Sequence, residues 1–151
     1  TILRYQPDKH TEIAYAKQQQ KHSDPLKLLF SNVTERLSVS RNFGPYGTLR
    51  YLTETREFDG LMANVPDSTK QYLAYETKLD PRTSLKAEQT ITQFDNGDKE
   101  NIQAYTVSTQ IAKGAGVSVT QVDVDRAGDE RDEKKRNYGF GVDLGGGLRF
   151  S

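Results

Sequence analysis

This chain of 151 residues contains no cysteine and no tryptophan, and it has only one methionine. Without cysteine it can form neither disulfide bonds nor thiolate metal sites. Basic and acidic residues number 21 each, so the formal net charge is zero. Because a nucleic-acid-binding protein normally carries a basic excess, we expect no nucleic-acid partner.

Apolar residues are also scarce. Hydrophobic residues make up 34% of the chain and the mean hydropathy is -0.79, whereas ordinary soluble domains carry roughly 45–50% by a count that includes glycine. No apolar run approaches the roughly 20 residues of a membrane-spanning helix. This composition is expected of a partly disordered chain or of strands that need only one apolar face. The eight tyrosines and six phenylalanines argue against wholesale disorder.

Alternation of apolar and polar residues is the main pattern that the sequence does contain. Between Gln71 and Leu79, for example, Leu73 and Tyr75 fall on one side of an extended chain and Ala74 on the other. No stretch has a convincing amphipathic helix pattern. We therefore predict an all-β protein, an antiparallel up-and-down meander of eight or nine strands in one domain over residues 1–151. A change of phase after Val119 predicts a β-bulge near residues 120–121.

The connections between the predicted strands alternate in length. Tight turns are predicted at 43–47, 80–84 and 113–116, and longer polar loops at 18–26, 59–70, 95–101 and 126–137. Outer-membrane β-barrels have short turns on the periplasmic side and longer loops outside, and most of the predicted strands have about the 9–11 residues that a tilted strand needs to cross a bilayer. The pattern thus favours a transmembrane β-barrel of eight or more strands.

The end of the chain carries a specific pattern, Asp143-x-Gly145-x-x-Leu148-x-Phe150, preceded by alternating large apolar residues from Tyr138. It resembles the C-terminal recognition strand of bacterial outer-membrane β-barrels, although Ser151 follows the aromatic residue. The stretch from residue 75 to residue 85 is likewise similar to the strand–turn–strand unit of Gram-negative porins.

The resemblance implies a place in the bacterial outer membrane, with outer-membrane lipid and the barrel-assembly machinery as partners. It identifies Asp143, Gly145, Leu148 and Phe150 as candidates for the assembly signal. The role would be that of a pore, a membrane anchor or the barrel part of a transport or secretion protein, alone, as a homo-oligomer or in a larger complex. Because such barrels have an even number of strands, either residues 1–5 form no strand or the chain is the C-terminal part of a larger barrel. With no initiator methionine and no leader pattern, we expect a mature chain or a fragment.

Charged residues recur on one face of the predicted strands. They are Arg36, Arg50, Glu54, Arg56, Glu76, Lys78, Lys86 and Glu88. A charge facing hydrocarbon at mid-depth costs roughly 2–4 kcal/mol for Arg or Lys, so in a barrel these residues would line the lumen. There they would pair across a narrow interior or bias the passage of ions through a wider one. On a soluble sheet the same residues would form ordinary cross-strand ion pairs.

A second hypothesis is a soluble antiparallel β protein that acts as a binding or surface-adhesion module at the cell surface or in the periplasm. The face of the predicted strands opposite the charged residues distinguishes it from the barrel. The apolar members of this face are Leu73, Tyr75, Leu79, Ile91, Val107 and Ile111. They would meet lipid in a barrel and pack into a core in a soluble protein, and Gln89 and Gln93 on this face favour the soluble protein. His10 and His22 fall in predicted loops with nothing to complete a metal site. We expect no enzyme activity, cofactor or metal.

Overall fold

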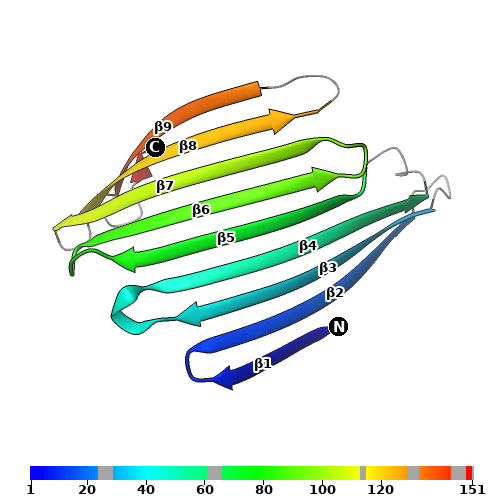
Figure 1. The fold of residues 1–151 in the computed structure, drawn as a ribbon, viewed down its shortest axis with the longest axis horizontal. Helices are drawn as coiled ribbons and strands as arrows, with labels where there is room; N and C mark the ends of the chain where they lie inside the picture. Colours follow the sequence, from blue (N-terminus) through cyan, green and yellow to red (C-terminus); the bar gives the residue numbers. More distant parts are fainter. Residues whose placement is uncertain (24–28, 61–65, 113–114, 129–132, 144–148, 151) are drawn as a thin grey trace.

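The computed structural model describes residues 1–23, 29–60, 66–112, 115–128, 133–143 and 149–150. They form one antiparallel sheet in which each strand pairs with its neighbours in the sequence (Figure 1). The strands are β1 (Ile2–Asp8), β2 (Thr11–Ser23), β3 (Leu29–Asn42), β4 (Thr48–Gly60), β5 (Ser68–Lys78), β6 (Thr83–Phe94), β7 (Lys99–Ala112), β8 (Ala115–Ala127), β9 (Glu133–Asp143) and β10 (Arg149–Phe150). A short 3-10 turn, η1 (Gly44–Tyr46), joins β3 to β4. The predicted all-β antiparallel meander is confirmed, and of the eight or nine strands predicted the described residues form nine long ones.

The sheet is open. Within the part of the chain that the structure describes, β1 pairs only with β2, and β9 pairs with β8 and the two-residue β10. Closure into a barrel is therefore not a feature of this sheet. Among the same residues, no helix is long and apolar enough to cross a membrane.

Several strands extend into segments that we predicted as loops or turns. β2 continues through the polar residues Gln18–Gln20, β8 runs to Ala127 and β9 begins at Glu133. The connections at 79–82 and 95–98 both have four residues, so the alternation of loop lengths is weaker than predicted. The physical reason is that polar side chains reach water from either face of a single sheet, so polarity alone does not end a strand.

The predicted bulge near residues 120–121 is wrong. β8 pairs without interruption with both neighbours from Gly116 to Arg126. The change of phase instead places Val122 and Val124 on the face opposite Val119, where their partners are Ala104 and Ile102. Val119, Val122 and Val124 thus have apolar partners in β7 on both faces of the sheet, so the strand needs no bulge to bring them to one face.

The described sheet has a single layer and almost no core of its own. Ala74 is the buried apolar residue and Glu54 the buried charged one, and each is 4% exposed. Stable domains normally bury a sheet face against a second layer. Large apolar side chains remain exposed here, among them Leu73, Tyr105 and Phe140. Exposed apolar surfaces of this kind are typical of sites that contact a protein partner, a ligand or a membrane.

Candidate functional site

The register assigns every paired residue to one of two faces. Residues directly opposite each other in an antiparallel pair share a face, and successive residues alternate between faces. The apolar face holds the rung of partners Tyr5, Ile13, Val39, Tyr51, Leu73, Gln89, Gln103, Asp123 and Arg136. The charged face holds the rung Ala16, Arg36, Glu54, Lys70, Thr92, Glu100 and Arg126.

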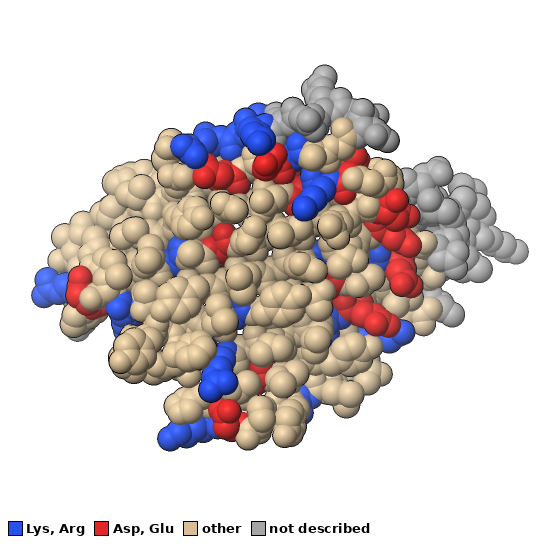
Figure 2. Space-filling model, viewed as in Figure 1, with Lys and Arg blue, Asp and Glu red and all other residues tan. Residues whose placement is uncertain are grey.

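An apolar band crosses the apolar face. Every strand from β1 to β9 contributes two neighbouring positions on this face to the band: Leu3 and Tyr5, Ile13 and Tyr15, Leu37 and Val39, Leu49 and Tyr51, Leu73 and Tyr75, Leu85 and Ala87, Tyr105 and Val107, Val117 and Val119, and Phe140 and Val142. Many of these side chains are exposed, up to 65% for Tyr5. Figure 2 looks onto this face, where most of the charged side chains lie towards the rim and the middle is mainly covered by uncharged residues.

The apolar band runs obliquely across the strands. The rungs that start at Tyr5 and Leu3 in β1 reach β8 at Asp123 and Asp125, yet the band in β8 lies at Val117 and Val119. The band has therefore shifted by six residues over the seven steps from β1 to β8. With about 3.3 Å per residue and about 4.8 Å between strands, it lies about 30° from the perpendicular to the strands.

Charges on the apolar face lie outside this band. The charged residues whose side chains the structure describes on this face of β2 to β9 are Lys17, Glu35, Arg41, Glu57, Lys99, Asp123, Asp125, Lys134 and Arg136. Several form cross-strand ion pairs, with 2.5 Å between Lys17 Nζ and Glu35 Oε1 and 2.7 Å between Arg136 Nε and Asp123 Oδ1. The lipid-facing candidates Leu73, Tyr75, Ile91 and Val107 share this face. Leu79 lies in the β5–β6 turn, and Ile111 lies at a register shift near the end of β7.

The eight predicted lumen residues all lie on the charged face, on strands β3 to β6. Register places Arg36 opposite Glu54, and Glu76 opposite Lys86. Two networks involve five of the eight. Among the described residues, the other three, Arg50, Glu76 and Lys78, make no ion pair; they line a hollow of about 540 Å³ beside the β3–β4 and β5–β6 turns.

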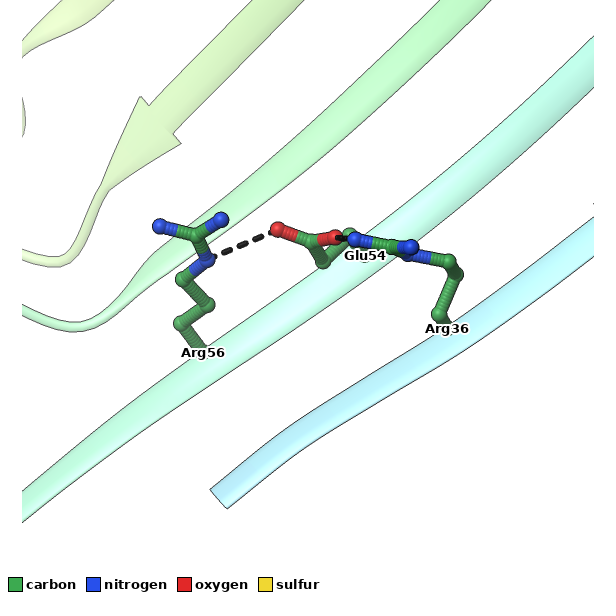
Figure 3. A network of polar contacts seen from close by, with 3 residues as sticks. All are labelled: Arg36, Glu54 and Arg56. Atoms are coloured by element: carbon green, nitrogen blue, oxygen red, sulfur yellow. Dashed lines mark hydrogen bonds and ion pairs between the residues drawn. The ribbon is translucent and has the colours of Figure 1, made fainter. Parts of the chain in front are cut away.

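The first network centres on the buried Glu54 carboxylate (Figure 3). Its Oε2 accepts hydrogen bonds from Arg36 Nε at 2.8 Å and from Arg36 Nη2, and its Oε1 accepts one from Arg56 Nε at 2.7 Å. The two arginine side chains are 51% and 53% exposed. A buried carboxylate is stable only when it is paired and hydrogen-bonded, and the two guanidinium groups satisfy both of its oxygens.

The second network joins β5 and β6. The hydroxyl of Tyr72 donates a hydrogen bond to Glu88 Oε1, and Lys86 Nζ lies 2.8 Å from the same oxygen. Tyr72 was not among the predicted site residues because it is an aromatic residue on a charged face. The sequence could have indicated it, because Tyr72 is four residues before Glu76 and therefore lies on the same face of the strand as the charged residues.

The candidate assembly signal lies partly outside the described residues, since Gly145 and Leu148 belong to 144–148. Asp143 ends β9, and Phe150 in β10 pairs back with Val142. The alternation from Tyr138 to Phe150 in the sequence predicts one continuous strand, and this prediction is wrong because β9 and β10 are antiparallel partners. In the sequence, three successive glycines at 145–147 interrupt the alternation, and glycine weakens strands. The role of these four residues as an assembly signal stays a prediction.

No family model, curated protein or solved structure matches this chain.

Proposed function

We propose that this chain forms part of the wall of a bacterial outer-membrane β-barrel. The apolar band would meet the lipid, and the charged face would line a polar lumen. The role would be passive, as a pore or as the barrel part of a transport or secretion protein. The observation that carries the proposal is the oblique, charge-free band.

The obliquity has a physical reason in a membrane. A bilayer is a flat slab, and barrel strands tilt by about 35–45° from the barrel axis. A band at constant depth must then climb along the rungs from strand to strand, as this one does at about 30°. The lengths also fit, because β2 to β9 contain 11 to 14 residues each. At about 3.3 Å per residue, they extend for about 36–46 Å.

The open edges set a requirement for this proposal. Unpaired backbone groups are not tolerated in hydrocarbon, so β1 and the β9 edge must pair when the sheet enters a membrane. Either they pair with each other or further strands complete the wall. The exposed apolar residues Leu3 and Tyr5 of β1 lie in the apolar band and would then be covered by lipid, whereas Ile2 would face the lumen.

A second candidate is a soluble β protein whose apolar band binds a protein partner. Two observations favour it. Gln89 and Gln103 lie on the same rung as Leu73, next to the band in β6 and β7. The band also covers only two same-face positions on each strand, which correspond to four residues of chain or about 13 Å along the strand. The apolar belt of a transmembrane barrel is about 25 Å tall.

Detergent dependence together with heat modifiability tests the proposal. The chain is extracted with and without detergent, and its electrophoretic mobility is compared before and after boiling. We expect a species that requires detergent and whose mobility shifts on boiling, since a closed barrel resists unfolding until it is heated. A monodisperse protein that is soluble without detergent and shows no shift would refute the barrel and support the soluble binding module.

A further inference from the structure

A polar trough lies on the charged face across β2, β3 and β4, with a volume of about 330 Å³. Its floor consists of the short side chains of Asn32 and Thr34 on the middle strand β3. Longer side chains stand on both sides, because Thr34 lies between Gln18 and Arg56 in one rung, and Asn32 lies between Gln20 and Phe58 in the next. Arg36 completes the lining.

The lining offers hydrogen-bond donors and two positive charges. Gln18, Gln20 and Asn32 have carboxamide N–H groups and Thr34 has a hydroxyl. Among the described residues that line the trough there is no carboxylate. This combination is suited to a negatively charged oxygen ligand, for which guanidinium groups are the preferred partners.

The Glu54 network holds the two guanidinium groups in place. Arg56 contacts Glu54 through Nε alone, and its two terminal nitrogens take no part in that contact (Figure 3). They therefore keep N–H groups for a ligand. Glu54 neutralises one of the two arginine charges, and a single net positive charge remains in the network. Because Glu54 already orders both side chains, less conformational entropy is lost when a ligand binds.

We propose that the polar trough binds an oxyanion, the phosphate or carboxylate group of a small solute. Arg56 donates from its terminal nitrogens, and the carboxamides of Gln18 and Asn32 supply further hydrogen bonds. The site depends only on the register of β2, β3 and β4. It therefore goes beyond the proposed barrel and exists whether the charged face lines a lumen or is open to water.

Equilibrium dialysis of the full chain against inorganic phosphate tests the site. Arg56→Gln removes the charge. Gln18→Glu instead places a carboxylate opposite Arg56 across Thr34, where it competes for the guanidinium while the Arg56–Glu54 contact stays intact. The matched control is Lys78→Gln, which removes a positive charge from the same face outside the trough. Each trough variant should weaken phosphate binding about tenfold or more, as expected for a lost charged hydrogen bond, and the control should bind as the wild type does.

Three results would overturn the site: no phosphate binding by the wild-type chain, equal weakening by Lys78→Gln, or unchanged binding in Gln18→Glu. Circular dichroism checks the fold of each variant, and Gln18→Glu keeps the test decisive if Arg56→Gln does not fold. The two proposals fail separately. A chain soluble without detergent that binds phosphate in the trough refutes only the barrel, and a heat-modifiable chain that does not bind phosphate refutes only the site.

Discussion

At the scale of single residues, the charged face depends most on Glu54. Its carboxylate is 4% exposed, whereas Arg36 and Arg56 each keep about half of their side-chain surface in water. The network is therefore asymmetric. An arginine that loses its partner returns to solvent, but a buried carboxylate that loses its partners stays without compensation.

Substitutions at the two ends of this network should differ in cost. Glu54→Gln should lower the free energy of unfolding by about 1 kcal/mol, the value of an ordinary hydrogen bond. The double variant Arg36→Met with Arg56→Met leaves the carboxylate unpaired and should cost roughly 3 kcal/mol or more. Urea unfolding measures both. The matched control is Arg50→Met with Lys78→Met, which removes two cations that form no ion pair among the described residues. Equal costs for Glu54→Gln and the arginine double variant would contradict this account.

At the scale of elements, the tight turns hold neighbouring strands in register. In the β5–β6 turn, the Asp80 carboxylate accepts hydrogen bonds from the backbone N–H groups of Arg82 at 2.7 Å and Thr83 at 2.9 Å. These bonds stabilise the charged form and hold the pKa of Asp80 below its ordinary value. In the β3–β4 turn the backbone itself is the constraint, because Gly44 and Gly47 both have positive φ.

The two glycines of the β3–β4 turn should respond differently to alanine. A Cβ on Gly47 would lie 2.2 Å from the backbone oxygen of Glu76 and 2.9 Å from Thr77 Cβ, whereas a Cβ on Gly44 would meet nothing within 4 Å. Gly44→Ala should therefore cost about 1–2 kcal/mol, the penalty for left-handed backbone alone. Gly47→Ala should cost clearly more because β4 and β5 must also separate.

Chemical denaturation of both alanine variants makes the comparison. Gly44→Ala serves as the matched control, because it measures the cost of placing alanine in a left-handed backbone conformation without a steric clash. A Gly47→Ala protein as stable as Gly44→Ala would mean that the close approach between the turn and β5 does not exist in solution.

At the scale of the whole molecule, the question is what covers the apolar band. Val107 lies in the band and is 43% exposed in the sheet, while its neighbour Ser108 points to the charged face. In a barrel, a lysine at residue 107 would face hydrocarbon and a lysine at residue 108 would face the lumen. On a soluble sheet, both would reach water.

Val107→Lys should therefore lower stability in lipid vesicles by roughly 2–4 kcal/mol, and the matched variant Ser108→Lys should change it much less. Unfolding by urea in the presence of vesicles measures both. If the two variants are equally stable, within about 0.5 kcal/mol of the wild type as for ordinary surface substitutions, the band does not face lipid.

Much of this architecture follows from the sequence by itself. Alternation of side chains is a property of the local backbone, so it was sufficient to predict a meander of eight or nine strands and to place the eight charged residues on one face of their strands. The β3–β4 turn was likewise predicted from Gly44 and Gly47, since glycine readily adopts positive φ. Assigning alternate residues to the two faces of a strand requires no knowledge of which strands are neighbours in the sheet.

Register, in contrast, was decided only by the tertiary structure. The pairing of strands determines which rungs align, and partners such as Arg36 and Glu54 are 18 residues apart in the chain. The oblique path of the band, the sharing of Glu54 between two arginines and the trough across β2, β3 and β4 all depend on that alignment. Strand ends were misjudged for a related reason. The sequence shows whether a residue such as Gln18 is polar, but whether it pairs with Thr34 depends on the neighbouring strand.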